Sequence, residues 1–287
     1  MHKLNNRILI VAEELHASLA KAETAVVDCR FSLANPTAGR EAYERGHIPG
    51  AVFLDLDEDL AAPITSASGR HPLPDPELLG QTLGRLGISR EQEVVVYDDS
   101  HGGVAARAWW VLRWLGHERV RLLDGGFAAW QAGGFSLEEG VAALSPAEYI
   151  PSVRAGLVLT TGELLAAGEY RETLNLLDAR DAGRFRGEYE PIDPVAGHIP
   201  GTRSLPFTDF VHDDGRWRPL EHRAAMLAEA LGGARDADWS VMCGSGVTAC
   251  HLAITGLEAG FREPRVYIGS WSEWIRDPLR PVATGDT

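Results

Sequence analysis

Cys243 opens the segment of this sequence that is best suited to chemistry. It follows the apolar run 240–242 and leads into Gly244-Ser245-Gly246-Val247-Thr248, ahead of residues with helical spacing. Two glycines so close together let backbone N–H groups turn toward one point and form an anion-binding nest. The start of the next helix would add partial positive charge and stabilise a thiolate. The segment predicts a nucleophilic cysteine held by its loop; a buried, inert cysteine is the alternative.

Three other known motifs were compared with the residues around Cys243. A phosphatase-type loop needs an arginine six residues after the cysteine, and this position holds Ala249. The pattern Gly244-x-Gly246-x-x-Ala249, with Glu263 further on, fits a degenerate dinucleotide fingerprint. Too little chain follows it to complete the usual nucleotide-binding fold. No Gly-Lys-Ser or Gly-Lys-Thr is present, so the sequence contains no P-loop.

The chain contains the same pattern twice. Gly46-His47-Ile48-Pro49-Gly50 recurs as 197–201, Val26–Arg30 resembles 176–180, and 124–130 matches 268–274 in the same order. We therefore predict two copies of one domain: an N-terminal, non-catalytic copy over 1–138, a linker over 139–155 and a catalytic copy over 156–287.

Each copy alternates short apolar runs with helical spacing. This alternation is typical of a mostly parallel sheet flanked by helices, so the fold class is α/β. The expected strands include Glu93–Tyr97, Val120–Leu123, Ser240–Cys243 and Arg265–Ile268, and the expected helices include Val104–Leu115 and Thr248–Ala259. In such sheets, ligands bind at the carboxyl ends of the strands, where Cys243 stands.

The first copy lacks a cysteine at the equivalent place. Its strand Glu93–Tyr97 leads into Asp98, which occupies the position of Cys243. A carboxylate cannot carry sulfur and would repel an anion. We therefore expect only the second copy to be catalytic.

Composition narrows the partners. The 287 residues include 27 Lys and Arg against 41 Asp and Glu, a net charge of −14, which disfavours nucleic acid and anionic membranes as partners. Cys29, Cys243 and Cys250 form neither a disulfide framework nor a C-x-x-C pair. We expect a cytoplasmic protein without a metal site.

Taken together, these motifs resemble the tandem-domain rhodaneses, and among them the 3-mercaptopyruvate sulfurtransferase type. The matching residues are the duplicated Gly-His-Ile-Pro-Gly, the segment Leu123-Asp124-Gly125-Gly126, and Cys243 to Ala249. The resemblance implies two tandem domains, each with a mostly parallel five-stranded sheet, and a persulfide on the loop cysteine.

The resemblance also assigns roles. Cys243 would be the nucleophile and sulfur carrier, and Arg184 would bind the substrate anion. Ser245, His71 and Asp57 would form a Ser-His-Asp set that delivers a proton to the leaving group. The anion cradle would be the backbone of Gly244, Ser245, Gly246, Val247 and Thr248.

One position departs from this pattern. Relatives of this type often carry a second arginine after the Glu-Pro that follows Arg-Phe-Arg-Gly, but here Glu190-Pro191 is followed by Ile192. Arg186 is a candidate substitute.

The expected function is transfer of sulfur from 3-mercaptopyruvate to a thiophilic acceptor, with release of pyruvate. The donor would be a small anion, and the acceptor a thiol or a thioredoxin-like protein. Two alternatives stay open: thiosulfate as the donor, or a persulfide relay or binding protein with little free turnover. Neither a metal nor an organic cofactor is implied.

Overall fold

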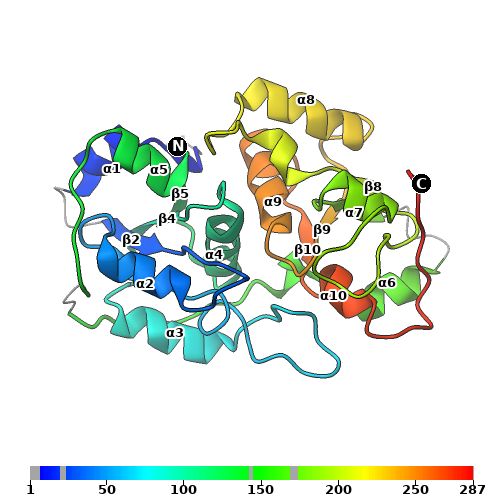
Figure 1. Ribbon diagram of the computed structural model, residues 1–287, viewed down its shortest axis with the longest axis horizontal. Coiled ribbons are helices and arrows are strands. Elements are labelled where there is room, and N and C mark those ends of the chain that lie inside the picture. Colours follow the sequence, from blue (N-terminus) through cyan, green and yellow to red (C-terminus); the bar gives the residue numbers. More distant parts are fainter. Residues whose placement is uncertain (1–6, 20–23, 142–144, 169–173, 287) are drawn as a thin grey trace. The chain divides into compact units, whose positions relative to one another are not determined.

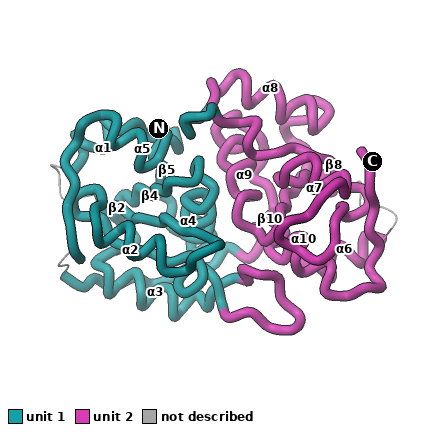
Figure 2. The backbone as a smooth tube through the Cα atoms, viewed as in Figure 1, with its two compact units in different colours: residues 1–62, 73–154, 212–217 teal, residues 63–72, 155–211, 218–287 magenta. Residues whose placement is uncertain are grey.

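The computed structural model describes residues 7–19, 24–141, 145–168 and 174–286, and these residues divide into two compact units (Figures 1 and 2). Unit 1 comprises 1–62, 73–154 and 212–217; unit 2 comprises 63–72, 155–211 and 218–287. Each half of the sequence thus lends one short segment to the other unit. The domain boundaries predicted above stay a prediction, and residues 142–144 of the predicted linker lie outside the described residues.

Unit 1 is built on a five-stranded sheet in the order β1-β5-β4-β2-β3, and all its strand pairs are parallel. The strands are β1 (Leu9–Ile10), β2 (Thr24–Asp28), β3 (Val52–Phe53), β4 (Glu93–Tyr97) and β5 (Val120–Leu123). The helices are α1 (Ala12–Leu19), α2 (Ala38–Arg45), α3 (Pro76–Arg85), α4 (Gly103–Trp114) and α5 (Gly126–Ala132). The central strands are nearly all apolar, as is usual for parallel strands covered on both faces.

Unit 2 repeats this plan with the strand order β6-β10-β9-β7-β8, again all parallel. The strands are β6 (Val158–Leu159), β7 (Leu176–Asp178), β8 (Arg203–Ser204), β9 (Ser240–Met242) and β10 (Arg265–Tyr267). The helices are α6 (Thr161–Ala167), α7 (Ala182–Arg186), α8 (Leu220–Ala230), α9 (Ala249–Glu258) and α10 (Ser270–Trp274). The predicted fold class is confirmed.

Corresponding residues fill the two cores. In unit 1, Phe127 and Trp130 belong to the buried core, and their counterparts Trp271 and Trp274 belong to the core of unit 2. In each unit, the helix after the central strand is buried along most of its length, namely α4 and α9. In each unit, the loop at the carboxyl edge of the sheet therefore lies between a buried strand and a buried helix.

Two features, a membrane-spanning helix and a cluster of metal ligands, are absent from the described residues. Within them, no helix is long and apolar enough to cross a membrane. Nor do three or more His, Cys, Asp or Glu side chains gather there as metal ligands would.

Candidate active site

Cys243 lies directly after β9, at the carboxyl edge of the unit 2 sheet, and is 2% exposed. Its N–H donates to the Ser270 hydroxyl at 3.1 Å, and its carbonyl accepts from the Trp271 N–H at 3.0 Å. The next carbonyl, of Gly244, accepts from the Ser272 N–H at 2.9 Å. The start of α10 thereby fixes the backbone that carries the thiol.

The loop after Cys243 depends on Gly246. This residue has φ +75°, and a Cβ added there would lie 2.5 Å from the Ile268 carbonyl oxygen. Any other side chain would strain the turn and collide with backbone. In the described part of the chain, no group accepts a hydrogen bond from the N–H of Ser245, Val247 or Thr248. These N–H groups can therefore serve an external anion, as a nest does.

The equivalent loop of unit 1 binds its own anion. Asp98 follows β4, and its carbonyl accepts from the Phe127 N–H at 2.8 Å, just as that of Cys243 accepts from Trp271. One carboxylate oxygen of Asp98 accepts from the N–H groups of Ser100 and Gly102, each at 2.9 Å. The other accepts from the N–H groups of Val104 and Ala105, each at 2.8 Å. The loop after β4 is thus an anion cradle whose anion is the Asp98 side chain.

Ser245 and His71 lie together in unit 2. The His71 Nδ1 is 2.7 Å from the Ser245 Oγ, and the two residues are 5% and 6% exposed. His71 was expected in the first copy, but it belongs to the segment 63–72 of unit 2. Asp57 lies in unit 1, on an exposed turn after β3, so its part in the predicted set stays a prediction.

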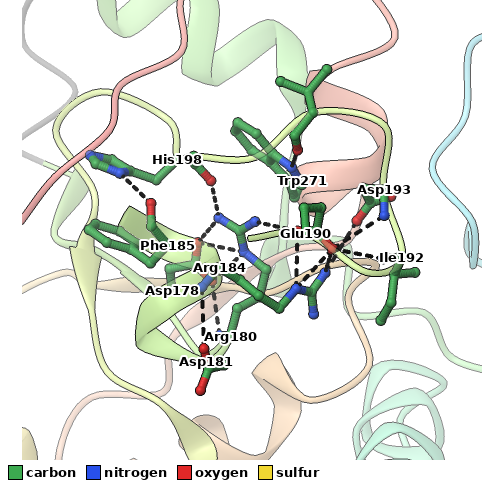
Figure 3. A network of polar contacts seen from close by, with 12 residues as sticks. Asp178, Arg180, Asp181, Arg184, Phe185, Glu190, Ile192, Asp193, His198 and Trp271 are labelled. Carbon is green, nitrogen blue, oxygen red and sulfur yellow. Dashed lines mark hydrogen bonds and ion pairs between the residues drawn. The ribbon is translucent and has the colours of Figure 1, made fainter. Parts of the chain in front are cut away.

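Arg184 lies on α7. The Asp181 side chain caps the start of this helix by accepting from backbone N–H groups, and Gly187, with φ +79°, caps its end. Its Nε donates to both oxygens of Glu190 at 3.0 Å, and its Nη2 lies 3.4 Å from Asp193 (Figure 3). Burial works to raise the pKa of Glu190, but the hydrogen bonds and charge of Arg184 overcome it and lower that pKa. Arg184 is therefore held in place by a permanent counter-charge.

A second guanidinium, Arg180, supports this network. It pairs with Asp178 at 2.7 Å, lies 3.6 Å from Glu190, and stacks 4.7 Å above the Trp271 ring (Figure 3). Trp271 is fully buried and donates its indole N–H to the Val195 carbonyl at 2.8 Å. The tryptophan is thus part of the core, and Arg180 links it to the acidic residues that hold Arg184.

Sequence reasoning missed Arg70. A Cβ built on Gly244 would lie 3.0 Å from the Arg70 Nη2 and 3.5 Å from the Arg184 Nη2, so both cations reach the residue after Cys243. Arg186, the candidate substitute for a second arginine, instead pairs with Glu188 at 2.6 Å and is partly exposed. The available signal for Arg70 was its position beside His71, a residue already singled out.

Ser270 was also missed. It is fully buried with φ +51°, a conformation that non-glycine residues rarely adopt. Its hydroxyl accepts from the Cys243 N–H and donates to the Tyr267 carbonyl at 2.8 Å. The equivalent residue of unit 1 is Gly126, with φ +56°. The repeat carried the signal: a serine where the other copy has glycine at the same turn.

Two substitutions at Ser270 separate strain from hydrogen bonding. Ser270→Ala keeps the strained Cβ and loses both hydrogen bonds, whereas Ser270→Gly loses the bonds but relieves the strain. We expect Ser270→Ala to lower the free energy of unfolding by about 1–2 kcal/mol more than Ser270→Gly. Denaturant unfolding of both variants measures the difference. Equal losses would show that the turn holds no strain at Ser270.

Comparison with known proteins identifies the family to which this fold belongs. A family profile described as "Rhodanese-like domain" matches residues 11–133 and 161–277, once in each half of the chain. The chain belongs to the rhodanese family. This rhodanese is 49% identical over 281 residues to a probable 3-mercaptopyruvate sulfurtransferase of Pseudomonas aeruginosa, covering 97% of this chain and 98% of that protein.

Two further relatives bear on the activity. A putative thiosulfate sulfurtransferase, SseB, of Mycobacterium tuberculosis is 39% identical, covering 97% of this rhodanese and 98% of that protein. The crystal structure of SseA from Escherichia coli, described as a 3-mercaptopyruvate sulfotransferase, is 31% identical with a TM-score of 0.81. That match covers 93% of this chain and 99% of SseA. The names of the relatives thus agree on sulfur transfer and differ on the donor.

Proposed function

We propose that this rhodanese is an enzyme that takes sulfur from 3-mercaptopyruvate through a persulfide on Cys243, releases pyruvate, and passes the sulfur to a thiophilic acceptor. The observation that carries the proposal is the loop after Cys243, in which the N–H groups of Ser245 and Val247 donate to no other group among the described residues. Their counterparts in unit 1, Ser100 and Gly102, donate to a carboxylate oxygen. The name of the Pseudomonas aeruginosa relative supports the choice of donor.

In the first half-reaction, the Cys243 thiolate attacks the sulfur of the donor. A sulfur–sulfur bond forms, and the carbon–sulfur bond breaks with its electron pair going to the enolate of pyruvate. The proton that the donor thiol carried ends on that enolate. Cys243 keeps a persulfide anion, which the N–H groups of the loop would stabilise as an oxyanion hole stabilises oxygen.

Ser245 and His71 suit the proton step. The hydroxyl and the imidazole are hydrogen-bonded at 2.7 Å, so each can accept a proton as the other donates one. In this proposal, the Ser245 hydroxyl gives its proton to the enolate, His71 restores the proton of Ser245, and the proton released from the donor sulfur returns to His71, so that the net transfer is from the donor thiol to the enolate. Asp57 keeps its proposed place as the carboxylate behind the histidine.

In the second half-reaction, an acceptor thiol attacks the outer sulfur of the persulfide. The acceptor leaves as its own persulfide, and Cys243 returns to the thiolate. A small thiol, a thioredoxin-like dithiol or cyanide fits this step, since each is a soft nucleophile. The covalent intermediate predicts ping-pong kinetics.

Thiosulfate is the second candidate donor, because the Mycobacterium tuberculosis relative is named for it and because Ile192 stands where a second arginine is expected. Steady-state turnover of both donors with one common thiol acceptor distinguishes them. Preference for 3-mercaptopyruvate is the expected result, and preference for thiosulfate would overturn the proposed donor. Turnover of neither would favour a persulfide relay between proteins.

Arg184→Ala is expected to weaken use of the donor more than use of the acceptor. Loss of a charge-assisted hydrogen bond of about 1.5–3 kcal/mol corresponds to a rise in donor KM of roughly ten- to hundredfold. The acceptor KM should not change, since the acceptor meets an enzyme from which the donor has already departed. Initial rates with each substrate varied in turn measure both constants. An unchanged donor KM would remove Arg184 from the donor site.

A cytoplasmic location is part of the proposal, and its support is that the three cysteines, all among the described residues, form no disulfide, as is usual in a reducing compartment.

A further inference from the structure

Arg180 follows the strand that pairs with the strand of the reactive cysteine. The N–H of Ala179 donates to the Met242 carbonyl at 2.8 Å, which continues the parallel pairing of β7 with β9 by one residue. Ala179 is therefore level with Cys243, and Arg180 comes next at the same edge of the sheet. The backbone thus brings the residue that carries this guanidinium beside the residue that carries the thiol.

Several contacts hold the Arg180 guanidinium in place. Its Nε and Nη2 donate to Asp178, and the Nη2 also donates to the Gly197 carbonyl at 2.7 Å (Figure 3). The group stacks over the ring of Trp271, whose main-chain N–H donates to the Cys243 carbonyl. The Arg180 side chain is 1% exposed, so it has almost no surface to offer a substrate. Arg180 is therefore a fixed internal charge.

One nitrogen of this guanidinium keeps its hydrogen-bonding capacity. Among the described residues, no group accepts a hydrogen bond from the buried Arg180 Nη1, which lies 3.6 Å from Glu190. Burial lowers the pKa of Arg180, but the charge and hydrogen bonds of Asp178 overcome it and raise that pKa. Glu190 and a negatively charged Cys243 raise it further. The guanidinium and a Cys243 thiolate therefore attract each other in a place that solvent screens weakly.

Unit 1 contains the same arrangement without the cysteine. Arg30 pairs with Asp28 at 2.6 Å and donates to the Gly46 carbonyl at 2.8 Å. It stacks 4.1 Å over the ring of Phe127, and its side chain is 5% exposed. The position of Cys243 is held there by an aspartate. The two arginines thus share one packing role and differ in the group beside them.

We propose that Arg180 supplies a fixed positive charge that stabilises the sulfur anion of Cys243, both as the thiolate and as the persulfide. The inference rests on the proposed function only in that Cys243 is the nucleophile. Arg180 acts through space and touches neither donor nor acceptor, which separates its role from that of Arg184.

The neighbouring charged and titratable groups are the same in every variant that changes Arg180 alone. Around Arg180 they are Asp178, Glu190, Asp193 and His198. Around the loop after Cys243 they are Arg70, Arg184 and His71. A change in pH dependence between such variants therefore reports the charge at position 180.

Alkylation of Cys243 by iodoacetamide measures its thiolate without any sulfur donor. The rate constant is measured against pH for the native protein, Arg180→Met and Arg180→Lys, and peptide mapping identifies the alkylated residue. Methionine keeps an unbranched stem without the charge, whereas lysine keeps the charge. Arg30→Met is the matched control, because Asp28 and Asp178 are both 0% exposed and each loses its partner in one variant.

We expect the midpoint of the rise in rate with pH to move upward by about one pH unit in Arg180→Met, because loss of the cation disfavours the thiolate. Below the native midpoint, this shift is a roughly tenfold fall in rate. At high pH, where the thiolate is fully formed, the rates should agree within about twofold. Arg180→Lys and Arg30→Met should keep the native midpoint.

An unchanged midpoint in Arg180→Met, an equal shift in Arg30→Met, or an equal fall in rate at every pH would overturn the inference. If the single variants do not fold, Arg180→Met/Asp178→Asn and Arg30→Met/Asp28→Asn leave no buried aspartate without its partner, and an upward shift in the first alone is again expected. Failure of the proposed function looks different, because the native enzyme would then not turn over 3-mercaptopyruvate while alkylation stays measurable.

Discussion

Cys243→Ser is expected to abolish turnover with 3-mercaptopyruvate and with thiosulfate alike. A serine hydroxyl stays protonated at neutral pH and cannot carry sulfur as a persulfide, so neither half-reaction can start. The residue lies in a preformed loop whose backbone is fixed by Ser270 and Trp271. The fold should therefore survive, with the thermal unfolding midpoint close to native. Turnover above the uncatalysed rate would contradict the role of Cys243.

Cys29→Ala is the matched control for this experiment. Cys29 follows β2 in unit 1 and is fully buried, and burial together with the charge of Asp28 raises the pKa of its thiol well above the usual range. The thiol therefore stays protonated and unreactive. Activity should stay at the native level, whereas loss of activity in Cys29→Ala would show that the assay reports damage to the fold.

Asp98→Ala is expected to destabilise unit 1 by more than about 3 kcal/mol. The carboxylate is 1% exposed and accepts hydrogen bonds from four backbone N–H groups, which would all lose their acceptor in a buried loop. Each hydrogen bond to a charged group contributes about 1.5–3 kcal/mol. Hydrogen exchange at β4 and α4 measures the loss where it occurs.

Two neighbouring substitutions calibrate that result. Asp98→Asn keeps one acceptor oxygen and should fall between the native protein and Asp98→Ala. Asp99→Ala removes an exposed carboxylate from the same loop and should change the stability little. Equal effects of Asp98→Ala and Asp99→Ala would show that the loop does not depend on its internal anion, and would weaken the analogy with the loop after Cys243.

The central strands and the reactive loop were predictable from sequence because their signals are local. The strands Glu93–Tyr97 and Val120–Leu123 have the predicted bounds, and β9 differs from its prediction by one residue. These segments are continuous apolar runs bounded by turn residues, and the repeat identifies each of them twice. The two-residue edge strands β1 and β6 were not predicted, since two residues carry no periodicity.

The partners of the loop were less predictable because they depend on tertiary contacts. Nothing in the letters of 63–72 shows that this segment groups with unit 2, where Arg70 meets Ser272 and His71 meets Ser245. Similarly, Arg186 lies closer in sequence to the missing arginine, but its side chain pairs with Glu188. Sequence proximity selected Arg186, whereas the fold places Arg70 near Gly244.

The most direct test of the account is the mass of the intact protein after one equivalent of 3-mercaptopyruvate is added without any acceptor. We expect one added sulfur atom per chain, located on Cys243 by peptide mapping, and one pyruvate released. Addition of a thiol should then remove the sulfur and restore the original mass. Pyruvate release without sulfur on Cys243, or sulfur retained by Cys243→Ser, would contradict transfer through a Cys243 persulfide.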